Sequence, residues 1–219
     1  MRYLVIMFFL VGYAAILAKN SIPKAKDVIA LPPPEQSGRM SVEEALARRR
    51  SVREFSSKHL TDQELGQLCW AAQGITHSEG LRTAPSAGAL YPLELYVVIS
   101  SGFFHYQPEK HQLQLRDRRN LRPHLRQAAL GQDSVGQAAA VFVITGEYAR
   151  TASKYGDARS PRYVHLEAGH AAENLLLQAV ALHLGAVPIG AFDDTQVKRA
   201  LSLSAGEQPL YLIPVGYPR

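Results

Sequence analysis

The spacing of apolar and polar positions predicts a chain in which helices and strands are mixed. One amphipathic helix has a full signature: Thr61 and Glu64 form a capping box at its start, and Gly74 ends it. Its apolar positions recur at i, i+3, i+4 and i+7, at Leu65, Leu68, Cys69 and Ala72. This face should therefore pack against the core.

The remaining pattern predicts further helices and several strands. Helices are expected from Ser41, with Glu44 as its capping-box partner, to about Arg49, near 121–131, from about His165 to Leu184, and from Asp193 or Asp194 to about Leu201. Strands are expected at 93–100, 103–106, 113–115, 140–145 and 210–215. Because helices and strands alternate without a βαβ rhythm, the fold class is α+β rather than doubly wound α/β.

The amino-terminal 40 residues differ from the rest. Residues 3–18 are almost wholly apolar and follow Arg2, which predicts a signal peptide, with cleavage after Ala18, or a short membrane anchor. As a helix they reach about 24 Å, short of the hydrocarbon core of a bilayer. Residues 19–40, with Pro32–Pro34, are expected to be a linker, and the folded domain is expected to span 41–219. We therefore expect membrane association or export, with the side of the membrane left open.

Composition narrows the class of protein. The chain has 219 residues and 47% hydrophobic content, which suits a single domain with a sizeable core. A net charge of +5 would suit nucleic acid, a membrane surface or an anionic small molecule, but no nucleic-acid-binding signature accompanies it. Metal-binding motifs of the zinc-protease type, P-loops and dinucleotide fingerprints are absent as well. Cys69 is the only cysteine, so no disulfide can form within the chain, and it is expected to be buried.

Three segments carry the candidate chemistry. Residues 48–55 bring arginines and Ser51 to the end of a helix, where guanidinium groups can hold a phosphate. Residues 85–92 form a turn of small residues between two prolines, in which Gly88 permits a positive φ or a close approach to the backbone. Residues 187–193 follow a glycine after the long helix. Taken singly, each segment also suits a solvated basic run, a tight surface loop or a buried strand.

Together and in this order, the three segments resemble the flavin-binding pieces of the nitroreductase family. The resemblance covers about residues 41–219 and is strongest to the branch of azoline dehydrogenases, which oxidise thiazolines and oxazolines in modified peptides. It implies a nitroreductase-like fold with a central mixed or antiparallel sheet flanked by helices. It also implies FMN as cofactor, and FMN is favoured over FAD because no dinucleotide fingerprint is present.

The resemblance also implies which residues contact the flavin. The phosphate and the pyrimidine edge of the ring would meet Arg49, Arg50, Ser51 and Arg53. The backbone of the turn would contribute through Pro85, Ser86, Ala87 and Gly88, and the segment over the isoalloxazine would be Pro188, Ile189, Gly190 and Ala191. The chain departs from many family members at Ala89 and Tyr91, where they carry asparagine and glutamine, and at Gly190, where they carry glutamate.

Lys154 and Tyr155 are the candidate catalytic residues. In the azoline-dehydrogenase branch a Lys-Tyr pair at this place is linked to catalysis, and oxidation of an azoline needs a base for one proton. A surface lysine in a polar loop is the alternative. The segment from Glu167 to Asn174 matches the family's helix start, where His170 suits packing or capping better than ligation.

The sequence thus predicts an FMN-dependent oxidoreductase that transfers hydride through flavin N5, with NAD(P)H as a potential donor. Two alternatives stay open: an azoline dehydrogenase acting on a modified peptide, and an exported flavin- or anion-binding module without turnover. A homodimer is expected because residues 175–182 are too apolar for an exposed face. No metal and no nucleic acid are expected.

Overall fold

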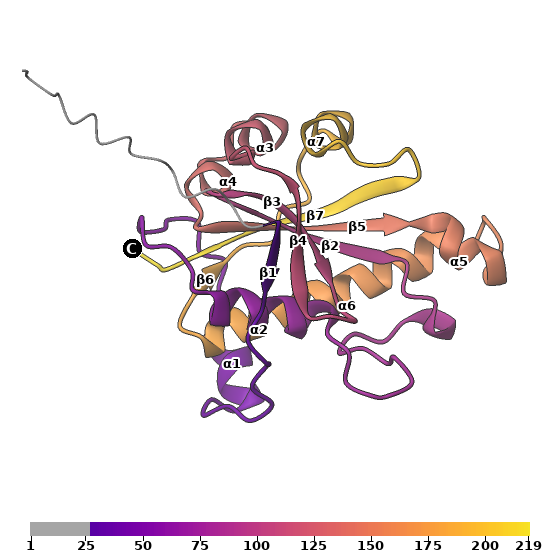
Figure 1. Cartoon of the computed structure of the whole chain (residues 1–219), viewed down its shortest axis with the longest axis horizontal. Coiled ribbons are helices and arrows are strands. Elements are labelled where there is room, and N and C mark those ends of the chain that lie inside the picture. Colours follow the sequence, from indigo (N-terminus) through magenta and orange to yellow (C-terminus); the bar gives the residue numbers. More distant parts are fainter. Residues whose placement is uncertain (1–26) are drawn as a thin grey trace, which may run out of the picture.

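The computed structural model describes residues 27–219, and its centre is a seven-stranded sheet (Figure 1). The strands lie in the order β1-β4-β3-β2-β5-β7-β6, and every neighbouring pair is antiparallel. They are β1 (Val28–Ala30), β2 (Leu93–Ile99), β3 (Gly102–Gln107), β4 (Gln112–Asp117), β5 (Ala140–Glu147), β6 (Gly185–Ala186) and β7 (Glu207–Gly216). The expected α+β class with an antiparallel sheet flanked by helices is confirmed.

Helices cover both faces of this sheet (Figure 1). One face carries α1 (Val42–Arg48), α2 (Asp62–Gln73) and the long α6 (Ser160–Ala181), and the other carries α3 (Arg122–Ala128), α4 (Asp133–Gln137) and α7 (Asp194–Leu201). The seventh α-helix of the described residues, α5 (Tyr148–Tyr155), continues from the end of β5. Each face has its own cluster of buried apolar side chains, so the sheet lies between two cores.

Local sequence explains how α2 begins. Thr61 Oγ1 accepts a hydrogen bond from the Glu64 N–H at 3.2 Å, and Glu64 Oε2 accepts one from the Thr61 N–H at 2.7 Å. Both halves of the expected capping box are therefore present. Cys69 is fully buried on this helix, as expected, and burial raises the pKa of its thiol.

Some boundaries differ from those expected. Ser41 caps α1, but Glu44 pairs with Arg48 at 2.6 Å instead of reaching back. The long helix begins at Ser160 rather than near His165, because Pro161 suits the first turn of a helix. It ends at Ala181 rather than Leu184, since His183 takes a positive φ of 58°.

The expected linker is part of the fold over its second half. Val28–Ala30 pair with β4 as the edge strand of the sheet, and Leu31 is buried. Glu35 exchanges two hydrogen bonds with the Gln67 side chain, at 2.8 and 2.9 Å. Folded structure thus begins before the predicted boundary at Ser41, because backbone pairing with β4 outweighs the polar, proline-rich composition.

The expected signal peptide or anchor at residues 3–18 lies outside the described residues. Among residues 27–219, no helix is both long and apolar enough to cross a membrane.

Candidate functional site

Helix α6 brings the three candidate segments together. Near its start, His165 and Ala168 line a cavity that Gly190 also lines, and Glu167 interacts with Ser86. Further along, Glu173 pairs with Arg49. From residue 165 to residue 174 the helix rises only about 14 Å. Segments that lie more than one hundred residues apart in sequence therefore converge on three turns of one helix.

The turn at residues 85–92 has an unusual backbone. Gly88 has φ of 65°, and the non-glycine residues Ala89 and Tyr91 have φ of 55° and 46°. Such values are uncommon for residues with a Cβ and persist only where surrounding contacts hold them. Ala87–Ala89 form a short 3-10 turn.

Specific hydrogen bonds hold this turn in place. The Tyr91 N–H donates to Ser86 Oγ at 2.9 Å, and the Tyr91 hydroxyl accepts from the Arg82 N–H at 3.1 Å. Arg150 of α5 donates to the Tyr91 carbonyl at 2.6 Å, and the Arg82 guanidinium lies 4.6 Å from the centre of the Tyr91 ring. Many relatives of the family carry glutamine at this position. In this chain, Tyr91 stabilises the turn through these contacts.

Lys154 and Tyr155 lie against this turn. A Cβ placed on Gly88 would stand 2.9 Å from Lys154 Nζ and 3.0 Å from the Tyr155 hydroxyl. Both residues belong to the last turn of α5, rather than to a loop, and Tyr155 packs on Tyr163 of α6 with ring centres 4.8 Å apart. The structure thus brings the candidate catalytic pair to the candidate flavin-binding turn, and Gly88 permits the close approach.

The basic segment is solvent-facing. Arg49 Nε lies 3.7 Å from Glu173 Oε1, a loose ion pair, while Arg50 donates to the carbonyls of Ala47 and Arg49. Arg53 is exposed. Ser51 forms a bridge with Ala186, which ties this segment to the chain that leads into residues 187–191. Guanidinium groups here remain accessible to an anionic ligand.

Residues 187–191 run beside β7. Ile189 pairs with Leu212 and is buried, whereas Gly190 and Ala191 are exposed and Pro188 is half-buried. A Cβ on Gly190 would meet no atom within 4 Å, so its backbone faces open space. Gly190 borders a cavity of about 350 Å³, in whose wall Tyr148 and His165 are hydrogen-bonded at 2.6 Å.

Glu167, which lies beneath the turn at residues 85–92, has a strongly shifted pKa. Its side chain is buried, and desolvation raises the pKa of its carboxyl group to about 7, although Ser86, Arg82 and Arg150 oppose the shift. In the sequence, Glu167 belongs to a family-like helix start without an assigned role, and no motif marks Arg150. Nothing in the linear pattern reports burial of a carboxyl group, so only the packing could find it.

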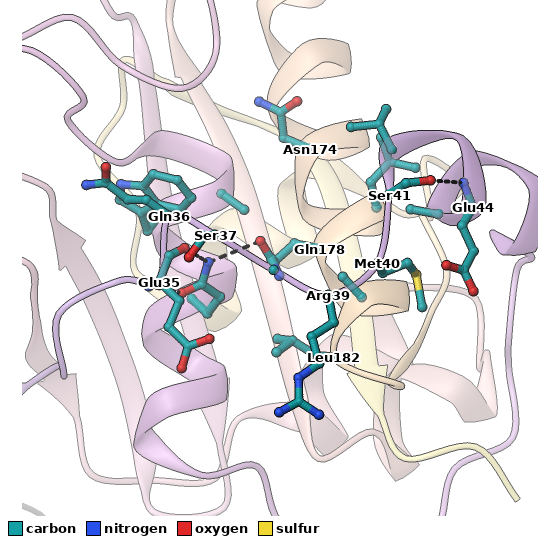
Figure 2. Close-up of a pocket in the computed structure, with 18 of the residues that line it drawn as sticks. Glu35, Gln36, Ser37, Arg39, Met40, Ser41, Glu44, Asn174, Gln178 and Leu182 are labelled. Carbon is teal, nitrogen blue, oxygen red and sulfur yellow. Dashed lines mark hydrogen bonds between the residues drawn. The ribbon is translucent and has the colours of Figure 1, made fainter.

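A larger cavity lies elsewhere (Figure 2). It has about 760 Å³ and runs between residues 35–48, α2 and the second half of α6. Glu35, Ser41, Asn174 and Gln178 are among its lining residues, whereas Arg49, Lys154 and Gly190 are not. Cavity size alone therefore does not locate the candidate chemistry. Among residues 27–219 no cluster of His, Cys, Asp and Glu side chains is arranged to hold a metal ion.

Comparison with known proteins agrees with this architecture. The model of the nitroreductase family matches residues 46–217. A protein of Methanocaldococcus jannaschii, provisionally named a nitroreductase, is 42% identical over 183 residues, which cover 81% of this chain and 91% of that protein. The chain belongs to the nitroreductase family, which points to an oxidoreductase.

Solved structures show the same fold. A provisionally named nitroreductase of Ralstonia eutropha JMP134 superposes with a TM-score of 0.81 at 32% identity, over 89% of this chain and 90% of that one. The NADPH:FMN oxidoreductase of Vibrio harveyi, solved with NAD+, has a TM-score of 0.62 at 24% identity, over 81% of this chain and 68% of that one. The latter likeness shows the fold alone.

Proposed function

We propose that this protein is an FMN-dependent oxidoreductase that works as a homodimer with the flavin at the subunit interface. The observation that carries the proposal is the convergence of residues 49–53, 85–92 and 187–191 on residues 165–173 of α6, with Lys154 and Tyr155 lying against the 85–92 turn. Family membership supports it, and so does the flavin chemistry in the name of the Vibrio harveyi neighbour.

The residues present fit FMN. Accessible guanidinium groups of Arg49, Arg50 and Arg53, with the Ser51 hydroxyl, provide the donors that a phosphate monoester requires. The open backbone at Gly190 leaves room for a flat ring and for hydrogen bonds from main-chain amides. The exposed backbone at Pro85 and Gly88 offers a second surface for the ring.

The side chains of the site would then have separate roles in the reaction. When bound, flavin would supply a two-electron acceptor that takes a hydride at N5. Lys154, in its neutral amine form, would take the proton that leaves the substrate, since its Nζ lies close to Gly88 of the turn. Tyr155 would orient the same substrate group, because its hydroxyl lies beside Lys154. The arginines would anchor the phosphate and leave the ring edge free.

Purified protein should therefore bind FMN non-covalently. FMN should copurify or bind on soaking, leave on denaturation, and be reduced under anaerobic conditions by NADH, by NADPH or by an azoline-containing peptide. Protein that stays colourless after soaking would overturn the proposal. Flavin that binds but that none of these donors reduces would favour the binding module without turnover.

An azoline dehydrogenase is the second candidate, and one observation favours it. Lys154 and Tyr155 lie against a turn in which Ala89 and Tyr91 replace the amide side chains common in the family. A base at this point suits removal of a proton from a thiazoline or oxazoline. Faster anaerobic reduction by azoline peptides than by NAD(P)H would distinguish this candidate.

Two variants can separate the catalytic role proposed for Lys154 from the cofactor-binding role proposed for Arg49. Lys154→Ala should slow substrate oxidation by roughly 10²-fold while FMN stays bound, and Arg49→Ala should chiefly weaken FMN binding. Lys110→Ala, an exposed lysine at the β3–β4 turn, is the matched control. Stopped-flow flavin reduction and equilibrium titration with FMN measure the two effects, and equal rates in Lys154→Ala and wild type would remove Lys154 from the mechanism.

A further inference from the structure

Arg150 connects three parts of the chain around the candidate turn. Its Nη1 donates to the Tyr91 carbonyl at 2.6 Å, and its Nη2 donates to Glu94 at 2.6 Å and to Glu147 at 2.5 Å. Glu94 belongs to the start of β2, and Glu147 is the last residue of β5. A planar guanidinium has five donors in a fixed fork, so one side chain can hold three acceptors at defined positions.

The carboxylate that anchors Arg150 is itself fixed to the sheet. Glu94 Oε2 lies 2.8 Å from His105 Nε2 on β3, the strand that pairs with β2. The Glu94 side chain is 23% exposed and the Arg150 side chain is 36% exposed, so water screens this ion pair only in part. Burial opposes ionisation of Glu94, but hydrogen bonds from His105 and Arg150 lower its pKa below the usual value. Arg150 therefore has a charged partner on a rigid element.

The helix that carries Arg150 also carries the candidate base. Arg150 and Lys154 are four residues apart on α5, so they lie on one face of that helix, one turn apart. This face meets the turn at two points, since Arg150 binds the Tyr91 carbonyl and Lys154 lies close to Gly88. Tyr91 has φ of 46°, a value that persists only where surrounding contacts hold it. The hydrogen bond from Arg150 is one of those contacts.

Resting on the proposed function, we propose that Arg150 is a positioning residue: by holding the Tyr91 carbonyl, it fixes α5 against the turn and so keeps Lys154 Nζ where it can take the substrate proton. Arg150 acts through Lys154 rather than on the substrate itself. A displacement of about 1 Å at a reacting group can lower the rate by up to about 10²-fold. Loss of Arg150 should therefore change the rate of substrate oxidation far more than the affinity for FMN, which rests chiefly on residues 49–53.

Two variants of Arg150 and one control make the test. Arg150→Gln removes the guanidinium. Arg150→Lys retains a cation for Glu94 and Glu147 but not the fork that also reaches the Tyr91 carbonyl, and it serves if Arg150→Gln does not fold. Arg126→Gln is the matched control, because Arg126 forms an ion pair with Asp133 on the opposite face of the sheet (Figure 1).

A nuclear Overhauser effect between the Lys154 side chain and Gly88, measured in flavin-free full-length protein, reports the position directly. Lys154 Cδ lies 3.1 Å from a Cβ placed on Gly88, so the effect should be present in wild type and in Arg126→Gln. It should be lost in Arg150→Gln and weakened in Arg150→Lys. Its absence from wild type, or equal strength in wild type and both Arg150 variants, would overturn the assignment. This measurement decides even if the protein binds no FMN, a result that would overturn only the proposed function.

A double-mutant cycle in the FMN-bound protein separates positioning from a general loss of stability. Anaerobic flavin reduction is followed with whichever of NADH, NADPH and an azoline-containing peptide reduces wild type fastest. Arg150→Gln should lower the limiting rate by roughly tenfold or more, with little change in the Kd of FMN. The same substitution made in Lys154→Ala should lower it by less than about twofold further, because the residue through which Arg150 acts is already absent. Equal losses in the two backgrounds would overturn the assignment.

Discussion

At the scale of single residues, Gly88 decides how closely α5 approaches the turn. Its φ of 65° disfavours any residue with a Cβ, and its missing side chain leaves the space that Lys154 Nζ and the Tyr155 hydroxyl occupy. Backbone conformation and side-chain packing thus both require glycine at this position. The two requirements can be separated by experiment.

Gly88→Ala should destabilise the protein by about 1 kcal/mol through backbone strain and should also displace Lys154, lowering the rate of substrate oxidation by roughly tenfold or more. Gly131→Ala is the control, because Gly131 has φ of 79° but nothing within 4 Å of the added Cβ. Urea unfolding and anaerobic flavin reduction give the two effects. Equal activity losses in both variants would show that strain alone, rather than the contact, is responsible.

His111 is a residue whose protonation state affects the stability of the fold. Its Nε2 lies 2.9 Å from the Pro32 carbonyl, which can only accept, so its Nδ1, 2.9 Å from the Tyr106 hydroxyl, is the acceptor in the neutral ring. Desolvation lowers the pKa of His111 below its usual 6.5. The folded state therefore prefers the neutral ring.

Because the unfolded chain binds this proton more readily, stability should fall as the pH drops below about 6.5. His111→Gln, which can still donate to Pro32, should lose less unfolding free energy than wild type between pH 7.5 and pH 5.5. His59→Gln, at an exposed histidine, is the comparison. Urea denaturation at the two pH values measures this, and identical losses in His111→Gln and wild type would contradict the interpretation.

At the scale of elements, the segment from β1 to residue 36 connects the edge of the sheet with helix α2. It adds an edge strand to β4, buries Leu31 and exchanges hydrogen bonds between Glu35 and Gln67. The same segment forms a wall of the larger cavity (Figure 2). Its contribution to stability comes from pairing and burial rather than from local propensity.

A chain that starts at Ser41 should accordingly be less stable than one that starts at Asp27, by about 3 kcal/mol from the burial of Leu31 and its neighbours. The lost edge strand should also expose β4 to aggregation. Urea denaturation and light scattering of the two chains test this. Equal stability would restore the boundary at Ser41 that the sequence predicts.

At the scale of the whole molecule, the face that carries α1 and α6 retains apolar side chains at the surface. Val42 and Leu46 of α1 are 66% and 53% exposed, and Leu166 of α6 is 56% exposed. Helix α1 packs against α6, and both helices cover the same face of the sheet (Figure 1). This arrangement is the physical basis for the proposed dimer.

Light scattering should give a dimer for the FMN-bound protein, and Leu46→Glu should shift it toward the monomer and weaken FMN binding. Leu130→Glu is the control, because Leu130 is 73% exposed beside α3, on the opposite face of the sheet (Figure 1). A wild-type monomer that binds FMN would refute the proposed interface.

The sequence by itself determined the class and order of the elements. Period-3.6 and β-branched patterns, with caps such as Thr61 and Glu64, are local signals, so α2, β2, β5 and the α+β class could be predicted from them. The family resemblance, confirmed for the nitroreductase family as a whole, rests on short segments that can be read along the chain. Local patterns contain this information because capping and periodicity involve neighbours within a few residues.

Only the tertiary structure decided which of these residues meet. The edge pairing of Val28–Ala30 with β4 and the contact of Lys154 with Gly88 join residues far apart in sequence. Burial on α6 raises the pKa of Glu167, while Ser86, Arg82 and Arg150, from two other parts of the chain, oppose the shift, and no local pattern contains that information. Long-range packing, which brings separate segments onto α6, is therefore what turns a set of motifs into a candidate site.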